Sequence, residues 1–257
     1  MSVDASGGMI SKALVLSAGN GSRLLPLTAE RPKCLLELGG KSLLERQLDA
    51  LEGAGIGEIV VVTGFRDDLV EATIAARPHS RSRVRTLYNP FYHVADNLGS
   101  VWIARREFDA DILLLNGDTL VTAELVAHVL AGASGAINVA IDRKAHYDAD
   151  DMKVLDASGR LLRIGKTLPQ QQTTGESIGL LAFQRTGRSQ FVDMVERAIR
   201  APDGMASWYL RAIDRLADET SVRTVSIEGF EWAEIDFQAD YEAAQRLCAR
   251  WDARAAA

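Results

Sequence analysis

The chain has 257 residues, of which 47% are hydrophobic and 25% are charged. These proportions are typical of a folded globular protein and exclude disordered and collagen-like classes. Its 29 basic and 35 acidic residues give a net charge of −6, which argues against a nucleic acid or an anionic membrane surface as the general partner.

The first ten residues are expected to form a mobile leader. They are polar and glycine-rich, and they lack the basic and apolar regions of a secretory signal. No apolar run in the chain approaches the roughly 20 residues that a membrane span requires. Cys34 and Cys248 do not have the spacing of a disulfide framework or a zinc site. We therefore expect a cytoplasmic protein without nucleic-acid or membrane partners, for which a homo-oligomer stays open.

Between residues 11 and 141, short β-branched runs alternate with amphipathic stretches. This alternation is typical of strand–helix–strand units around a mostly parallel sheet. Apolar stripes of helical period begin at Leu44, Leu69 and Leu125. The predicted strands are 13–18, 59–63, 84–88, 112–115 and 137–141.

From Met152 the pattern changes to that of a small antiparallel insert. Two short apolar runs flank residues 156–159, Asp-Ala-Ser-Gly, and such a turn between two runs indicates a hairpin. No internal repeat or long linker divides the chain, so we expect a single domain over residues 1–257 with a C-terminal lobe over the sheet edge. The later predicted elements are a strand at 178–183, helices near 189–199 and 207–216, a strand at 222–227 and a final helix around Leu247.

A turn with two glycines follows the first predicted strand. Gly19 and Gly21 remove side chains where a backbone must approach a bulky anion, and exposed amides in such a turn can hold phosphate oxygens. Arg23 and Lys33 add two cations nearby. The spacing departs from the dinucleotide fingerprint and from the P-loop, and a Gly-x-Gly pair by itself also fits a simple tight turn. With the two cations, the pattern predicts a phosphate site.

The stretch LVLSAGNGSRLLPLTAERPKCLLELGGKSLLERQLDAL closely resembles the opening of the nucleoside-triphosphate-dependent nucleotidyltransferases that activate sugar phosphates, phosphocholine and related phosphate esters. The family signature, roughly LAAGxGxRLxPLTxxxPKxLL, is matched with Ser17 in the place of one alanine. The resemblance implies a Rossmann-like, GT-A-like α/β fold with helices on both faces of the sheet. It also implies NTP and Mg²⁺ as ligands and pyrophosphate as the leaving group. Residues 11–141 would be the nucleotide-binding half and 142–257 the acceptor-binding half.

Two acidic residues are candidates for holding the metal ion. Asp118 follows the strand at 112–115, at the carboxyl edge where open α/β sheets bind ligands. Asp236 lies in WAEIDFQADY, which resembles the WxEID segment of the family. Carboxylates suit Mg²⁺, which prefers oxygen ligands, so the resemblance implies that both acids bind it. The alternative is that each carboxylate caps a helix.

The segment NPFYHVADNLGSVWIA resembles the region where the family binds the base and the ribose. Asn97 is the residue type found there in the phosphocholine and related cytidylyltransferases, and Gly99 would let the backbone meet the base edge. With the glycine turn, the residues expected to contact the nucleotide are Leu16, Ala18, Gly19, Asn20, Gly21, Asn97, Gly99 and Ser100.

Lys166 in RIGKTL resembles the family lysine that binds the phosphate of the acceptor. Many sugar-nucleotide enzymes carry Glu-Lys-Pro here, whereas this chain has Gly165 in the place of the acid that binds sugar hydroxyls. The segments YDADDMKV, GESIGLLAF, SWYLRAI and WAEIDF instead resemble the branch that uses CTP with small alcohol phosphates. The residues expected to bind the acceptor are Lys153, Glu176, Tyr209 and Trp232, with further acids at Asp148, Asp150 and Asp151 and further aromatic walls at Tyr147 and Trp208. The alternative is that the acidic cluster is a solvated turn and that the tryptophans pack the C-terminal lobe.

The resemblance leads to the hypothesis of a cytidylyltransferase that transfers CMP from CTP to a small phosphate or phosphonate ester, such as phosphocholine, an aminoalkylphosphonate or inositol phosphate. Arg23, Lys33 and Lys166 would neutralise the two anions that must meet. One alternative is a sugar-1-phosphate nucleotidyltransferase that uses UTP, dTTP or GTP. Another is a catalytically silent nucleotide-binding regulatory subunit.

Overall fold

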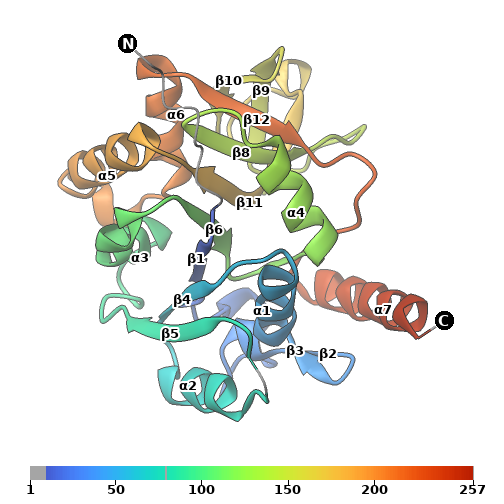
Figure 1. Cartoon of the computed structure of the whole chain (residues 1–257). Coiled ribbons are helices and arrows are strands. Elements are labelled where there is room, and N and C mark those ends of the chain that lie inside the picture. Colours follow the sequence, from blue (N-terminus) through green and yellow to red (C-terminus); the bar gives the residue numbers. More distant parts are fainter. Residues whose placement is uncertain (1–9, 79, 257) are drawn as a thin grey trace.

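A nine-stranded sheet forms the centre of the computed structural model, which describes residues 10–78 and 80–256 (Figure 1). The strand order is β5-β4-β1-β6-β11-β8-β12-β10-β9, with a further pairing of β11 with β9. β11 is antiparallel to both of its main neighbours, and the strands on the β5 side of it are parallel. The strands of this sheet are β1 Lys12–Leu16, β4 Glu58–Thr63, β5 Arg83–Tyr88, β6 Ile112–Asn116, β8 Ile137–Asp142, β9 Lys153–Ala157, β10 Arg160–Ile164, β11 Gly175–Phe183 and β12 Val222–Ser226.

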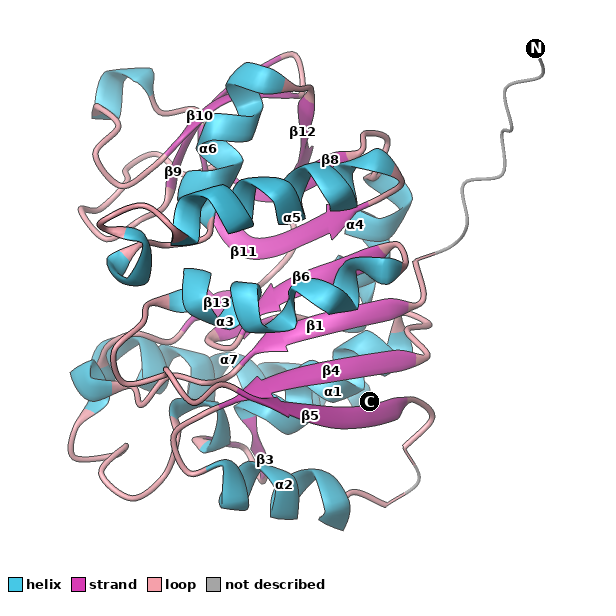
Figure 2. Cartoon of the chain, turned by 90° about the vertical axis from the view of Figure 1, so that its left-hand side faces the viewer, coloured by secondary structure: helices cyan, strands magenta, loops and turns pink. Residues whose placement is uncertain are grey.

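Helices cover both faces of the sheet, with α3 and α5 on one face and α1 and α4 on the other (Figure 2). Successive residues of a strand point to opposite faces, so Leu14 belongs to one apolar core and Val15 to the other. This two-sided burial explains why the central strands are continuous apolar runs. The α-helices are α1 Leu43–Gly53, α2 Asp67–Ala76, α3 Asn97–Ile103, α4 Ala123–Gly132, α5 Thr186–Ile199, α6 Leu210–Glu219 and α7 Gln238–Ala255.

The predicted fold class and the antiparallel insert are confirmed. β9 and β10 form the predicted hairpin, whose turn at Ser158 and Gly159 has positive φ angles of 51° and 72°. The C-terminal lobe over the sheet edge stays a prediction, although one of its strands, β12, inserts between β8 and β10 and so lies inside the sheet. Helix α3 is not among the predicted elements, because the sequence of residues 97–103 predicts only contacts with the base and the ribose.

The leader predicted over residues 1–10 falls almost wholly outside the described residues, which begin at Ile10. Ile10 itself is buried in the core, so the predicted boundary is wrong at that residue. Cys34 and Cys248 are both buried and free. Within residues 10–78 and 80–256, no helix combines the length and the apolar character needed to cross a bilayer.

Two pairings bring distant segments to one edge of the sheet. Leu16 at the end of β1 lies opposite Asn116 at the end of β6, so the loops after both strands leave from the same place. A short ladder between β7 (Thr119–Leu120) and β13 (Ala233–Glu234) then holds the segment around Asp236 against the end of β6. The Ile235 N–H donates to the carbonyl of Asp118 at 3.1 Å. Residues more than 100 positions apart therefore meet at this edge.

Candidate active site

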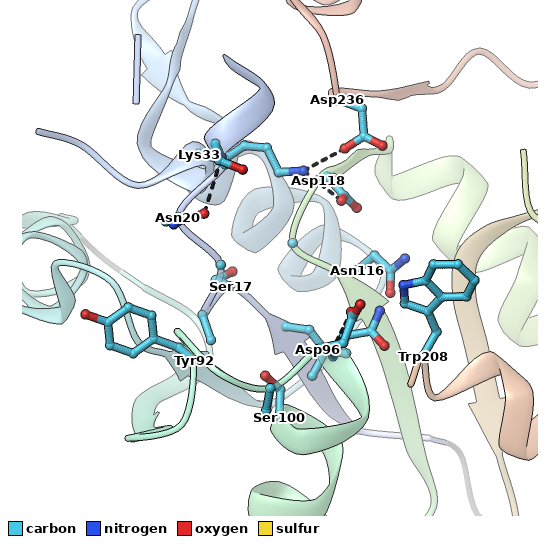
Figure 3. A pocket seen from close by; sticks show the side chains of 18 of the residues that line it. Ser17, Asn20, Lys33, Tyr92, Asp96, Ser100, Asn116, Asp118, Trp208 and Asp236 are labelled. Atoms are coloured by element: carbon cyan, nitrogen blue, oxygen red, sulfur yellow. Dashed lines mark hydrogen bonds and ion pairs between the residues drawn. The ribbon is translucent and has the colours of Figure 1, made fainter. Parts of the chain in front are cut away.

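A cavity of about 560 Å³ opens at the carboxyl edge of β1 and β6. Its walls come from the glycine turn, the end of β6, the start of α3, the segment before α6 and the end of β13. Figure 3 shows Lys33 reaching toward Asp118 and Asp236 on one side, with Ser100 and Asp96 on the opposite side. The predicted site residues in its walls are Leu16, Ala18, Gly19, Asn20, Gly21, Arg23, Lys33, Asn97, Ser100, Asp118, Lys166 and Asp236.

The glycine turn is built for a chain that folds back on itself. Gly21 has a φ of +66°, which favours glycine, and a Cβ there would lie 2.9 Å from the Cβ of Lys33. The Thr28 hydroxyl donates to the Gly21 carbonyl at 2.8 Å and fixes the turn. At Gly19, by contrast, a Cβ would meet no atom within 4 Å. The fold therefore requires glycine at position 21, whereas position 19 is free of any steric demand from the protein.

Gly19→Ala is expected to leave the melting temperature unchanged and to weaken nucleotide binding at least about tenfold, which corresponds to one charge-assisted hydrogen bond. The added methyl group would contact no protein atom. It would occupy the space through which a phosphate must approach the backbone. Isothermal titration calorimetry and a thermal melt give the two readouts. Gly21→Ala is the comparison, and it should lower both stability and affinity. Unchanged affinity in Gly19→Ala would mean that phosphate does not approach this turn.

Three carboxylates gather at one end of the cavity. Oxygen atoms of Asp118, Glu234 and Asp236 all lie within 4.8 Å of one another. Asp118 Oδ1 is buried, and in the described part of the chain it has no hydrogen-bond partner. Like charges 4 Å apart repel by about 4 kcal/mol at an effective dielectric of 20. A cluster of oxygen ligands with one unused acceptor fits a divalent cation such as Mg²⁺.

Glu234 is not among the metal ligands predicted from the sequence, although it lies in the WAEID segment. Residues two positions apart in an extended segment project to the same side, so the spacing of Glu234 and Asp236 is a signal for a carboxylate pair. Loss of solvent around the cluster and the charges of Asp118 and Asp236 raise the pKa of Glu234 to about 8, although its side chain stays exposed to the cavity.

The helix-cap alternative is excluded for Asp236, because Asp240 accepts the N–H bonds at the start of α7. Asp118 precedes a strand, β7, and not a helix.

Two of the three predicted cations, Arg23 and Lys33, contact these acids. Lys33 Nζ lies 2.8 Å from Asp118 Oδ2 and 2.9 Å from Asp236 Oδ1, and a nitrogen of Arg23 lies 3.1 Å from Asp236 Oδ2. Burial would lower the pKa of Lys33, but the charges of Asp118 and Asp236 outweigh it and raise that pKa above its ordinary value. Burial would likewise raise the pKa of Asp236, yet Lys33, Arg23 and Lys166 together lower it. Lys33 is therefore an ammonium and Asp236 a carboxylate at neutral pH.

Lys166 lies in the cavity wall beside Trp208, with its Nζ 4.7 Å from the centre of the Trp208 ring and 3.9 Å from an oxygen of Asp150. An ammonium over an aromatic face is a favourable cation–π contact. Lys153, predicted to bind the acceptor, does not line the cavity. It is buried, and its Nζ donates to the carbonyl of Lys166 at 3.0 Å, so it supports the backbone of Lys166.

Glu176 does not line the cavity, and its carboxylate is paired with a lysine of the protein. Lys144 lies 2.9 Å from Glu176 and 2.8 Å from Asp151, so both predicted acids are paired within the protein. Burial, opposed by Lys144, raises the pKa of Glu176 to about 7. Asp148 is exposed and lies outside the cavity wall, where only Asp150 represents this acidic segment.

Tyr209 and Trp232, the predicted aromatic walls, also lie elsewhere. Tyr209 is fully buried, and its hydroxyl donates to Asn116 Oδ1 at 2.9 Å. Trp232 packs against the second core, and its indole N–H donates to Asp142 at 2.7 Å. Tyr147 is buried as well. Of the predicted aromatic residues, Trp208 is the one that the structure brings to the cavity. The alternative of packed aromatic residues is correct for the others.

The start of α3 forms the wall opposite the acids. Asn97 and Ser100 line the cavity, but Gly99 does not. Gly99 is buried, and a Cβ there would lie 2.6 Å from the Cβ of Ala95, so helix packing accounts for this glycine. Asn97 Oδ1 accepts the N–H of Tyr209 at 2.9 Å, which ties α3 to the start of α6.

Comparison with known proteins agrees with this geometry. Residues 13–225 match the family described as MobA-like NTP transferase domain. A CTP:phosphoglutamine cytidylyltransferase of Campylobacter jejuni is 24% identical over 255 residues, which cover 90% of this chain and 97% of that protein. Three further curated relatives are longer proteins, of which the chain spans between 24% and 52%.

Solved structures share the fold over nearly the whole chain. The CTP:phosphocholine cytidylyltransferase of Streptococcus pneumoniae superimposes with a TM-score of 0.75 at 19% identity, covering 92% of this chain and 98% of that chain. A UDP-glucose pyrophosphorylase in complex with UDP-glucose gives a TM-score of 0.79 at 14% identity, covering 94% and 99%. At such low identity these superpositions establish the nucleotidyltransferase fold.

Proposed function

Because the chain belongs to the family of MobA-like NTP transferase domains, we propose that it transfers CMP from CTP to a small phosphate or phosphonate ester and releases pyrophosphate. The resemblance stated from the sequence is thereby confirmed at the level of the family. The observation that carries the proposal is the meeting of Arg23, Lys33 and Lys166 with the carboxylate cluster in one cavity.

The reaction needs no nucleophile from the protein. An oxygen of the acceptor phosphate attacks the α-phosphorus of CTP, and a new P–O bond forms. The bond from the α-phosphorus to the oxygen that bridges to the β-phosphate breaks, and pyrophosphate leaves with the electron pair. Because the attacking oxygen is already ionised at neutral pH, the catalytic task is to hold two polyanions together and to neutralise their charge.

Each charged group in the cavity has a task in this reaction. The glycine turn and Arg23 would bind the β- and γ-phosphates, and Lys33, whose Cβ adjoins Gly21, would bind the triphosphate near the reacting centre. Lys166 would bind the acceptor phosphate from the other side. Asp118 and Asp236, with Glu234 beside them, would hold Mg²⁺. When bound, Mg²⁺ supplies charge neutralisation at the α-phosphate.

CTP is the favoured nucleotide for two reasons. The Campylobacter relative and the Streptococcus structure described above both act on CTP by their names. Asn97 lines the cavity with its Oδ1 already accepting a backbone N–H, so the donors of its amide group remain for acceptors such as O2 and N3 of cytosine. We assign nucleotide binding to residues 11–141 and acceptor binding to residues 142–257. The second half also supplies Glu234 and Asp236 to the carboxylate cluster.

The acceptor wall favours a compact ester with a cationic or polar head group. Trp208 is 40% exposed beside Asp150 and Lys166, and an aromatic face next to a carboxylate suits an ammonium group. When the acceptor phosphate draws Lys166 away, that face becomes free for the head group. Gly165 carries no side chain, and a Cβ there would meet nothing within 4 Å, so it provides no acid for sugar hydroxyls.

A panel of pyrophosphate-release assays tests the proposal. CTP, UTP, dTTP and GTP are each combined with phosphocholine, 2-aminoethylphosphonate, inositol phosphate and glucose 1-phosphate in the presence of Mg²⁺. We expect turnover with CTP and one of the first three acceptors, and none without an acceptor. Turnover of glucose 1-phosphate with another NTP would instead establish the sugar-1-phosphate alternative, which the UDP-glucose pyrophosphorylase fold favours. Nucleotide binding without any turnover would indicate a regulatory subunit.

A further inference from the structure

Lys33 contacts two of the carboxylates, Asp118 and Asp236, that the proposed function assigns to the metal ion. Its Nζ donates to Asp118 Oδ2 at 2.8 Å and to Asp236 Oδ1 at 2.9 Å. The side chain is only 16% exposed, so this ammonium is held in place on both carboxylates. A divalent ion bound to the same two carboxylates would bring a second cation beside the Lys33 ammonium, so Lys33 and the metal compete for these acids.

From its position in the chain, the Lys33 ammonium can also reach the glycine turn. Its Cα begins the short 3-10 helix Lys33–Leu35 after Pro32, and its Cβ packs against Gly21 in the predicted phosphate turn. A lysine carries its charge on a flexible four-carbon stem. The side chain can therefore pivot between the acids at one end of the cavity and a phosphate at the glycine turn, with its backbone unmoved.

We infer that Lys33 is an internal counter-ion that yields the carboxylates to the metal only when the nucleotide phosphates receive its ammonium. Metal and nucleotide then bind with positive cooperativity. The metal displaces the Lys33 ammonium from the carboxylates, which frees it for the phosphates, and the phosphates draw it away from the carboxylates, which frees these for the metal. Such coupling is reciprocal, so the nucleotide raises the affinity for metal by the same factor as metal raises the affinity for nucleotide. The inference rests on the proposed nucleotide and metal roles of this cavity.

Neighbouring cations do not replace Lys33 in this role. Arg23 contacts only Asp236, at 3.1 Å, and its side chain is 48% exposed. Lys166 faces Trp208 and Asp150. In the described part of the chain, Lys33 is the basic residue that bridges two members of the carboxylate cluster. Removing its charge alone should therefore expose the metal ligands.

The test measures Mn²⁺ binding by electron paramagnetic resonance, with Mn²⁺ as the probe of the divalent site. Lys33→Met is compared with the wild-type chain, each without nucleotide and with α,β-methylene CTP. We expect Mn²⁺ alone to bind Lys33→Met at least about fivefold more tightly than wild type, the lower end of usual coupling factors. The gain in Mn²⁺ affinity that the CTP analogue gives should be smaller in Lys33→Met than in wild type.

Lys41→Met is the control, since it removes a surface cation that pairs with Asp49 outside the cavity, and its affinity for Mn²⁺ alone should equal that of wild type. Lys33→Arg should keep the weak binding of wild type. Equal Mn²⁺ affinity in wild type and Lys33→Met would overturn the inference. Because the metal-alone measurement does not depend on which nucleotide is used, this result differs from a failure of CTP turnover, which would contradict the proposed function.

A thermal melt keeps the inference testable if Lys33→Met is poorly folded without metal. Asp118 and Asp236 then repel each other without the Lys33 bridge, and a ligand that binds only the folded state stabilises it. We expect millimolar Mg²⁺ to raise the melting temperature of Lys33→Met, or of Lys33→Gln in its place, by several degrees more than it raises that of wild type. An equal rise in variant and wild type would contradict the inference.

Discussion

Asp118→Asn is expected to reduce metal-dependent pyrophosphate release by at least about a hundredfold, the usual cost of losing one group that stabilises the transition-state charge. Asparagine has nearly the same shape as aspartate, so the end of β6 and the contact between the Asp118 carbonyl and the Ile235 N–H should persist. What is lost is a negative charge and one anionic ligand in the cluster with Glu234 and Asp236. The assay is steady-state pyrophosphate release as a function of Mg²⁺ concentration.

Asp148→Asn is the control for this variant. Asp148 is 78% exposed and lies outside the cavity wall, so its replacement should leave the rate and the Mg²⁺ dependence unchanged. A thermal melt should show both variants folded. Wild-type turnover in a folded Asp118→Asn protein would remove the carboxylate cluster from the reaction.

Lys166→Met is expected to raise the KM for the acceptor and to lower kcat, while the KM for CTP changes little. A charge-assisted hydrogen bond contributes about 1.5–3 kcal/mol, which corresponds to a tenfold to hundredfold loss in kcat/KM for the acceptor. Methionine keeps an unbranched apolar side chain of similar length, so the loss reports the ammonium group and not the packing. Initial rates with each substrate varied in turn separate the two KM values.

Lys41→Met serves as the control, since Lys41 is 55% exposed and pairs with Asp49 at the surface. Its kinetics should match those of wild type. A Lys166→Met enzyme that loses affinity for CTP and acceptor equally would place Lys166 on the nucleotide. Kinetics identical to wild type would remove it from the site.

The central sheet could be predicted from the sequence because its strands are buried on both faces. Residues 59–63 of β4, for example, are continuously apolar or β-branched, and such a run is typical of a strand that is covered on both faces. The place of β12 could not be predicted in this way. Its run of five residues fits an edge position as well as one between β8 and β10, and only the pairing of strands far apart in the chain decides.

The charged part of the candidate site was predictable for a similar reason. Gly21 lies in the turn after β1, and Asp118 lies in the turn after β6. Because β1 and β6 are parallel, both turns meet at one edge of the sheet, and Lys33 packs against Gly21 there. The acceptor side was not predictable. Whether an acid such as Glu176 faces a ligand or Lys144, and whether an aromatic residue such as Tyr209 faces a cavity or the core, depends on contacts across the fold.

The fate of the α-phosphate tests the central claim most directly. CTP labelled with ³²P at the α-position or at the γ-position is incubated with the enzyme, Mg²⁺ and the acceptor that the panel selects. Transfer of CMP predicts that the α-label moves to a CDP-linked product and that the γ-label appears in pyrophosphate. A γ-label found in inorganic phosphate, or an α-label that never joins the acceptor, would contradict the account.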